Sequence, residues 1–483
     1  MPSEQGSFGV PPSLENAGVF HRPAGRCGDE VATISEAWEH PRLEAVMLQN
    51  DLFRLALGLA EPWFVSDVRL DLKLDLDLDL KLDRKTGRKQ DRKPEVKDEA
   101  GVDPGELHVT IDFSPGSRFA CSECAESGLE VHDTLERTWQ HLGFFEHEAW
   151  LHARLPRTRC GKCGVHLVSV PWARPGSGFT LLFEAMSLML VAQMPVLAAS
   201  RLMKTTDGRL WRVLRAYVDL ARKKVDMSGV TMVAADETSS KKGHSYVSIF
   251  ADPRPQERKV LFVTAGKDQT TFDEFLKDLQ AHGGSAKNVT DVVADMSAAF
   301  QAGKEKCFPD ALLTHDKFHA IKLVTDAVDK TRRLEVTSRP ELKGTRYIFL
   351  KNPLNLTEKQ LETWDQLKDG NFKTLKAYNL YLAFRDIWDY TPVAAPAALG
   401  RWIGWALRSR VEPMVKAAQT IRKHVKSILR VLSNDLTTAV MEGINSLVQA
   451  AKARARGYRN IDNFKTIIYL IAGRLDLRFA HTK

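Results

Sequence analysis

Three acidic side chains in this 483-residue chain stand where they could hold a divalent metal ion. Asp236 ends the apolar run GVTMVAAD, and Asp295 ends the run NVTDVVAD, 59 residues further along. Both runs predict buried strands. Glu442 opens the segment MEGINSLVQAAKARARGYRN, in which apolar residues recur at helical spacing. Converging carboxylates suit Mg²⁺, which prefers oxygen ligands and retains water.

Such a cluster could catalyse phosphoryl transfer, since two ions roughly 3.5–4 Å apart can activate the attacking oxygen and stabilise the leaving one. Each acid also has a simpler interpretation: Asp is common in turns, and a Glu beside basic residues is typically a solvated surface side chain. Glu237 could replace Asp236, but it points to the opposite face of the strand. Asp316, Lys317 and His319 in THDKFHAIKL are auxiliary candidates, with a structural role favoured for the Asp and the His.

Basic residues accompany two predicted helical segments. The first has a short helix over 196–204, a turn, and a second helix over 210–221, which is typical of a helix-turn-helix motif, although a plain helical hairpin is the alternative. The second segment follows Glu442. Residues 401–483 contain 16 Lys and Arg but only 5 Asp and Glu, which favours a nucleic-acid partner. The DNA-binding candidates are Arg209, Arg212, Arg215, Lys452, Arg454, Arg456 and Arg459.

Four of the six cysteines form two C-x-x-C pairs. These are Cys121 with Cys124 and Cys160 with Cys163, and 35 residues separate the pairs. Two such pairs predict a closed, structural Zn²⁺ site with four thiolate ligands, whereas a redox C-x-x-C is the alternative. Among nearby histidines only His166 is a plausible substitute ligand.

The elements that must position the acids form a recognisable order. Residues 229–329 predict three strands at short spacing, a helix, the strand ending at Asp295, a helix, a further strand and a helix. This is the order of a ribonuclease-H-like mixed α/β sheet, in which the first strand is central and the fourth lies beside it. Carboxylates at the ends of these two strands should therefore meet.

The remaining chain divides around this catalytic segment. Residues 1–46 predict a disordered extension, with Met47 a candidate for the true start. We expect a β-rich zinc-binding domain over 47–175, with a charged low-complexity insert near 72–103 in a hairpin loop, followed by the helix-turn-helix segment at 176–228. An all-α insertion at 330–433 interrupts the catalytic domain, whose final helices occupy 434–483. The fold class is thus multidomain α+β.

As an ordered set, the motifs CSEC, CGKC, VAADETS, DVVADMSAAF, THDKFHAIKL and MEGIN resemble those of ISL-three-type insertion-sequence transposases. The resemblance extends from about residue 50 to 480. It implies a zinc finger, a helix-turn-helix and a catalytic domain with a DDE triad, which by motif would be Asp236, Asp295 and Glu442. It further implies catalytic Mg²⁺ or Mn²⁺, recognition of terminal inverted repeats, and cutting and joining through 3′-hydroxyl attack.

Two departures from the family pattern leave alternatives open. The charged insert and the N-terminal extension raise the question of whether this copy is active. The spacing around Glu442 also makes Asp435 and Glu412 alternative third acids. A non-catalytic DNA-binding protein and a ribonuclease-H-like nuclease without strand transfer are the competing functions.

The expected partner is double-stranded DNA, both element ends and target. Joining two ends requires at least a homodimer on DNA. No apolar run reaches 18 residues and no signal sequence is recognisable, so we expect no membrane contact and a cytoplasmic protein, associated with the nucleoid when bound to DNA.

Overall fold

The computed structural model describes residues 50–73, 103–241, 245–433 and 439–478. The expected extension at 1–46, most of the insert near 72–103, and Asp435 lie outside these ranges. The chain divides into two compact units, Met1–Gly58 and Leu59–Lys483. In the first unit residues 50–56 are helical. All further description concerns the second unit.

The N-terminal part of this unit is a five-stranded sheet. Strands β1 and β2 pair antiparallel, with Trp63 opposite Phe113, so the charged insert joins two neighbouring strands as expected. The order is β1-β2-β4-β3, and β5 pairs with β4. Edge-to-face contacts among Trp63, Phe113 and Trp172 fill the core. The strands are β1 (Trp63–Lys73), β2 (Asp103–Phe113), β3 (Val131–Phe144), β4 (His147–Cys160) and β5 (Gly164–Leu167).

Three helices follow: α2 (Leu181–Gln193), α3 (Val196–Leu202) and α4 (Asp207–Lys223). Thr180 and Thr206 accept hydrogen bonds from amides in the first turns of α2 and α4, which fixes where these helices begin. Their hydrophobic core also includes Ala451 of α13 (Ala439–Arg454) and Ile467 of α14 (Ile461–Ala472). The helix-turn-helix segment therefore packs directly on the last two helices.

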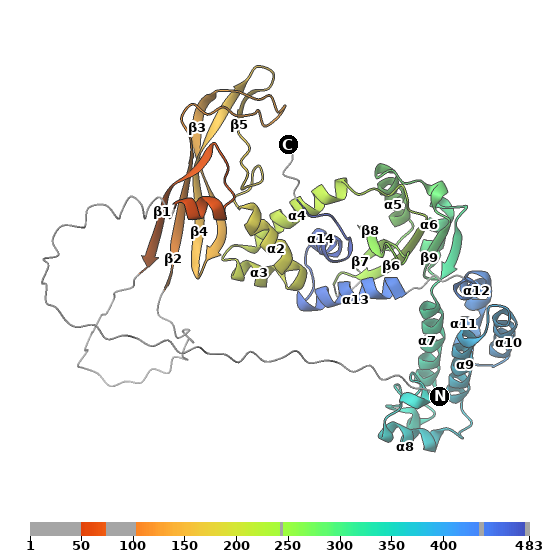
Figure 1. Ribbon diagram of the computed structural model, residues 1–483. Coiled ribbons are helices and arrows are strands. Elements are labelled where there is room, and N and C mark those ends of the chain that lie inside the picture. Colours follow the sequence, from red (N-terminus) through yellow and green to blue (C-terminus); the bar gives the residue numbers. More distant parts are fainter. Residues whose placement is uncertain (1–49, 74–102, 242–244, 434–438, 479–483) are drawn as a thin grey trace, which may run out of the picture. The chain divides into compact units, whose positions relative to one another are not determined.

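The second sheet has the order β10-β9-β6-β7-β8. Figure 1 labels β6, β7, β8 and β9 of this sheet. Its strands are β6 (Met232–Ser239), β7 (Tyr246–Asp252), β8 (Lys259–Ala265), β9 (Asp291–Ala294) and β10 (Leu312–His315). Strands β6, β7 and β8 pair antiparallel, whereas β9 and β10 run parallel to β6. The prediction that the first strand of this segment is central and the fourth lies beside it is confirmed.

Helices cover both faces of this sheet. Phe272 and Phe275 of α5 (Thr270–Ala281) and Phe300 of α6 (Ala298–Cys307) pack on the face that includes Val233. Helices α13 and α14 pack on the other face, where Ala234 contributes. The alternation of neighbouring residues between the two cores follows from the period of two in a strand.

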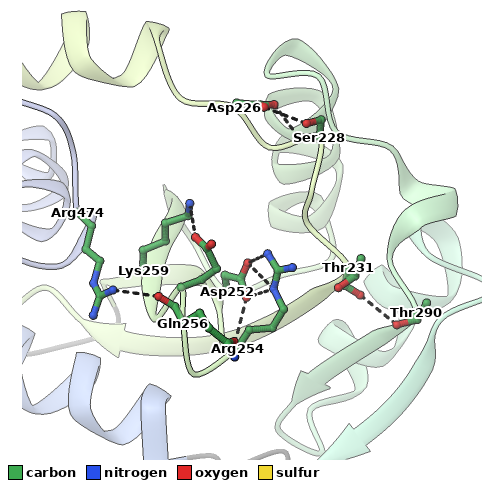
Figure 2. Close-up of polar contacts among 10 residues, drawn as sticks. Asp226, Ser228, Thr231, Asp252, Arg254, Gln256, Lys259, Thr290 and Arg474 are labelled. Atoms are coloured by element: carbon green, nitrogen blue, oxygen red, sulfur yellow. Dashed lines mark hydrogen bonds and ion pairs between the residues drawn. The ribbon is translucent and has the colours of Figure 1, made fainter.

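The β7–β8 turn is held by ion pairs (Figure 2). Asp252 is fully buried and accepts hydrogen bonds from the backbone N–H and guanidinium of Arg254. Lys259 pairs with Glu257 at 2.6 Å, and Arg474 donates to the carbonyl of Gln256. The buried acid at this turn is thus neutralised by a cation on the same turn.

Between β10 and α13 the chain is helical and has its own hydrophobic core. Trp402 lies in this core and its indole N–H donates to the carbonyl of Leu380 at 2.7 Å, whereas Trp405 is 42% exposed. The helices are α7 (Lys317–Glu335), α8 (Glu358–Leu367), α9 (Lys373–Arg385), α10 (Ala395–Leu407), α11 (Glu412–Lys423) and α12 (Val425–Ser433). Short 3₁₀ turns occupy Ala286–Asn288, Pro340–Leu342, Pro353–Asn355 and Asp386–Asp389. None of the described helices is long and apolar enough to cross a membrane.

Candidate active site and cysteine cluster

Asp236 and Asp295 follow a pair of residues that lie opposite each other. Ala235 of β6 pairs with Ala294, the last residue of β9, in parallel register. The residue that follows each of these alanines in the chain is the aspartate. Asp236 Oδ1 accepts the amide N–H of Glu237 at 2.8 Å, and Asp295 Oδ1 accepts that of Ser297 at 2.9 Å. The structure therefore brings two of the three predicted acids to one edge of the sheet.

Burial disfavours the charged form of Asp236. It raises the pKa of Asp236, and the charge of Asp295 adds to the increase, while the Glu237 amide and the His319 ring oppose it. Burial also raises the pKa of Glu237, with Lys267 opposing. Asp252 is also buried but is paired with Arg254, whereas the raised pKa of Asp236 indicates that a bound cation would favour its charged form.

Glu442 lies in the first turn of α13 and is exposed. Partial desolvation and the charge of Asp316 raise its pKa, and Lys317 opposes that increase. Within the described residues, the four cysteines are the only group of three or more His, Cys, Asp or Glu whose ligand atoms all lie within 4.8 Å of one another. The three carboxylates are thus not gathered that closely, and the triad assignment stays a prediction.

A residue that the sequence reasoning missed contacts Asp236 directly. Asn445 of α13 donates from Nδ2 to Asp236 Oδ2. One and two turns further on, Gln449 donates to Thr238 Oγ1, and Lys452 donates to the carbonyl of Ser239 at 2.5 Å. The sequence could have indicated Asn445 through its spacing, because Asn445 follows Glu442 by three residues and therefore lies on the same face of the helix.

The auxiliary candidates surround the start of α7. Asp316 is the N-cap residue, and its Oδ1 accepts the amide N–H of Phe318 at 2.9 Å, so it has a structural role. His319 Nδ1 lies 3.5 Å from Asp316 Oδ2. Asp316 raises the pKa of His319, and Asp236 and Asp295 contribute. His319 is therefore an electrostatic neighbour of both acids. Lys317 lies over the ring of Phe318 at 5.2 Å.

The alternative third acid Glu412 lies at the start of α11 and pairs with Lys416 at 2.7 Å. Its pKa is lowered, chiefly by the hydrogen bond from Lys416. A carboxylate with a cation of its own has less need of a metal ion. Glu442, whose pKa is raised, is the better candidate on these grounds.

Four of the seven DNA-binding candidates make contacts within the protein. Arg209 stacks over Phe179 at 4.1 Å, and Arg215 donates to Asn463 at 2.6 Å. Lys452 binds Ser239, as described above, and Arg454 donates to the carbonyl of Gln193 at the end of α2. Arg212, Arg456 and Arg459 are exposed. A DNA contact stays a prediction for all seven, and these three have the side chains best placed for it.

The four cysteines converge from two turns of the N-terminal sheet. Cys121 and Cys124 lie in the turn before β3, while Cys160 ends β4 and Cys163 precedes β5. The sulfur atoms lie within 4.8 Å of one another, and those of Cys124 and Cys160 are 3.6 Å apart. Tetrahedral Zn–S bonds of about 2.3 Å require sulfur separations of about 3.8 Å, so the arrangement fits zinc.

Local geometry explains this convergence. The backbone of Ala125, in the first turn, is left-handed with φ of +60°, and Gly164 has φ of +91°, so both turns reverse the chain tightly. Backbone N–H groups of Cys124 and Glu123 lower the pKa of Cys121 to about 7, whereas the Cys124 side chain and burial raise that of Cys163 to about 12. Four neighbouring thiolates repel one another, and a bound cation would neutralise their charge. His166 is outside the cluster.

Comparison with known proteins identifies three transposase domains along the chain. Three models match in order: a zinc finger of transposases of the IS204/IS1001/IS1096/IS1165 type at residues 117–163, the helix-turn-helix domain of transposase family ISL3 at 168–218, and an ISL3 transposase domain at 233–468. The chain belongs to the ISL3 family of transposases. The zinc-ribbon and helix-turn-helix predictions are confirmed, and the zinc-finger match together with the cysteine cluster supports the predicted structural Zn²⁺.

Curated relatives are transposases of insertion sequences. One from Bordetella parapertussis, for IS1001, is 27% identical over 75% of this chain and 91% of its own length. Another from Mycobacterium tuberculosis, for IS1557, is 27% identical over 67% of this chain and 79% of its own length. The match to the ISL3 transposase domain covers residues 233–468, so Asp236, Asp295 and Glu442 all lie within it.

Proposed function

We propose that this transposase binds the terminal inverted repeats of its own insertion sequence, cleaves DNA there in a metal-dependent reaction, and joins the ends to a target. The observation that carries the proposal is the parallel pairing of Ala235 with Ala294, which leaves Asp236 and Asp295 side by side at one edge of the sheet. The strand order supports a ribonuclease-H-like classification of this domain.

The donor set fits Mg²⁺ or Mn²⁺. Asp236 and Asp295 offer carboxylate oxygens from adjacent strands, which hard cations prefer. Burial of Asp236 close to another acid supplies the electrostatic demand for a cation. We assign Asp236, Asp295 and Glu442 as the ligands. Bound ions would supply activation of the attacking oxygen and stabilisation of the leaving oxygen.

Two displacements at phosphorus account for cutting and joining. In the first, water attacks the phosphodiester at the element end and the P–O3′ bond breaks, so the leaving oxygen takes a proton and a 3′-hydroxyl results. In the second, that hydroxyl attacks a target phosphodiester and the target's 3′ oxygen leaves. We assign His319, an electrostatic neighbour of both acids, to proton exchange with the attacking or leaving group.

Recognition of the ends is assigned to the helix-turn-helix segment and to the basic stretch after α13. Arg212 in α4 and Arg456 and Arg459 after α13 are exposed cations suited to phosphates. Joining two ends in one complex requires at least two copies of the chain on DNA. The homodimer and nucleoid association are proposed on this basis.

Two other functions use the same structure. A DNA-binding protein without catalysis would bind element ends with strong salt dependence and without any need for Mg²⁺. A ribonuclease-H-like nuclease would cut but never join. The raised pKa of Asp236, which a bound cation would oppose, favours a cation-dependent enzyme over the first alternative. Only analysis of the reaction products separates a transposase from a nuclease.

The test is to incubate the full-length protein with labelled DNA carrying its element ends and a circular target plasmid, with and without Mg²⁺. We expect nicks at the ends only with the metal, followed by joined products. Specific binding without cleavage in Mg²⁺ or Mn²⁺ would establish the DNA-binding alternative. Cleavage with free 3′-hydroxyls and no joined product would establish the nuclease.

A further inference from the structure

One face of α13 is polar along its whole length. Glu442, Asn445, Gln449 and Lys452 follow one another at intervals of three, four and three residues, which places all four on the same side of the helix. The last three donate in turn to Asp236, Thr238 and Ser239 of β6. Glu442 is the only member of this row without a contact to β6 among the described hydrogen bonds.

The spacing of these contacts matches on the two elements. Seven residues of helix, from Asn445 to Lys452, rise about 10.5 Å. Three residues of strand, from Asp236 to Ser239, extend about 10 Å. Over this length α13 and β6 therefore run in the same direction. The spacing of Asn445, Gln449 and Lys452 along the helix matches the spacing of their partners along the strand. The three contacts form a ladder, defined here as Asn445, Gln449 and Lys452 with their partners on β6.

The apolar face of α13 cannot fix this register as firmly. Met441, Ile444, Val448 and Ala451 are buried against the sheet and α14. These residues repeat at the same three- and four-residue intervals, so a shift of one turn would place apolar side chains on apolar positions again. The hydrophobic effect is non-directional, so burial of these side chains does not distinguish the two registers. The same shift would break every contact of the ladder, because hydrogen bonds require defined distances and angles.

We propose that Asn445, Gln449 and Lys452 are positioning residues that fix the register of α13 on β6 and thereby hold Glu442 one helical turn before Asn445, the residue that contacts Asp236. The proposal rests on the proposed function, because it gives Glu442 its place beside the two aspartates. It also gives Lys452 a role inside the protein instead of on DNA. Asn445 additionally orients the Asp236 carboxylate through Nδ2.

The experiment uses Gln449→Ala and Lys452→Ala in the full-length protein, because neither side chain touches an acid of the triad. Ser446→Ala, an exposed position on the same helix, is the matched control. Three quantities are measured: the cleavage rate at saturating DNA, the affinity for DNA ends with its salt dependence, and hydrogen exchange of residues 439–454 without DNA or Mg²⁺.

We expect each ladder variant to lower the cleavage rate roughly 10- to 100-fold, the range seen when supporting groups around a metal site are removed. Affinity and its salt slope should stay at the wild-type values. Exchange in α13 should become faster by several-fold, because local opening becomes easier. Gln449→Glu cannot donate as Gln449 does, but its carboxylate can accept a hydrogen bond from the Thr238 hydroxyl instead, so this variant should recover most of the rate. Ser446→Ala should behave as wild type.

Two results would overturn the proposal. If Lys452→Ala weakens DNA binding and reduces the salt slope by about one while the rate at saturation is unchanged, Lys452 binds phosphate. If Gln449→Ala leaves hydrogen exchange of α13 at the wild-type rate, the ladder does not set the register. Failure of the wild type to cleave would overturn the proposed function alone, since hydrogen exchange still tests the ladder.

Discussion

The cysteine cluster and the strand ends that carry Asp236 and Asp295, here called the carboxylate edge, are both candidate metal sites. They differ in how closely the structure gathers their predicted ligands. The four sulfur atoms lie within 4.8 Å of one another. At the carboxylate edge, Asp236 and Asp295 are adjacent through strand pairing, while Glu442 is exposed on a helix and 146 residues lie between it and Asp295. One site is closed, as structural zinc requires, and the other is open, as catalysis requires.

The difference follows from the distance over which each site is assembled. Each cysteine pair lies on one tight turn, so local backbone geometry fixes two ligands at once, and the β3–β4–β5 pairing brings the two turns together. The third acid depends on how α13 packs after a long helical region. We therefore expect perturbation of the cysteines to act on folding, and perturbation of the acids to act on chemistry.

Replacing a zinc ligand should give the largest effect on structure. Cys160→Ser removes a buried ligand of the cluster, and structural zinc contributes folding free energy of about 10 kcal/mol or more in isolated zinc-finger peptides. We expect loss of bound zinc, as measured by atomic absorption, and a cooperative loss of the N-terminal sheet that weakens DNA binding. Ser122→Ala, an exposed position in the first turn, serves as control. Full zinc content in Cys160→Ser would refute the four-thiolate site.

Replacing an acid of the active site should reduce the reaction rate but leave the fold intact. Asp295→Asn keeps the shape and the bond from Ser297 but removes the charge. We expect cleavage of element ends to fall by at least about 10²-fold, the scale for losing one electrostatic contribution to a transition state. Zinc content and affinity for DNA should not change. Wild-type cleavage by this variant would show that Asp295 is not a metal ligand.

The contrast between the sites also explains what the sequence could predict. Strand order and the meeting of Asp236 with Asp295 could be predicted because the hydrophobic pattern marks each strand and the order of elements restricts the topology. The cysteine cluster could be predicted from spacing alone. The contact between Asn445 and Asp236 could not, because it depends on the register of two elements 209 residues apart.

The same limit applies to the basic residues. A pattern of arginines on α4 indicates a DNA-binding surface, but it cannot show which side chains pack inward. Arg209 stacks on Phe179, and Arg215 bonds to Asn463 of α14, a helix that lies far away in sequence. Positive charge along a helix therefore predicts the partner more reliably than it predicts the contacting residues.

Asp236 on β6 and Asp252 on β7 can be compared directly, because among the described contacts Asp252 has an arginine partner and Asp236 has no ion-pair partner. Burial raises the pKa of Asp236, so its charged form is disfavoured in the folded state. Asp252 is buried but bonded to Arg254. In Mg²⁺-free buffer at neutral pH, Asp236→Asn should raise the thermal unfolding midpoint, whereas Asp252→Asn should lower stability by about 2 kcal/mol through loss of a charged hydrogen bond.

The advantage of Asp236→Asn should depend on pH. Because the folded-state pKa of Asp236 is raised, the wild type gains stability as pH falls through that pKa, and the gain is complete below the unfolded value of about 3.9. The difference between wild type and Asp236→Asn should therefore shrink on acidification within this window. A difference that is constant with pH would mean that Asp236 carries no electrostatic cost.

The smallest effect should come from an exposed arginine of α4, and it separates binding from both metal sites. Arg212→Ala removes a cation that is exposed on the helix between Arg209 and Arg215. Loss of one phosphate contact should weaken DNA binding by about 1 kcal/mol, near fivefold, and reduce the salt slope by about one, as measured by fluorescence anisotropy at several salt concentrations. Zinc content and the cleavage rate at saturating DNA should be unchanged. Arg215→Ala, in contrast, should reduce thermal stability through the lost bond to Asn463. If Arg212→Ala instead lowers stability without changing affinity, α4 contributes to packing and another surface holds the DNA.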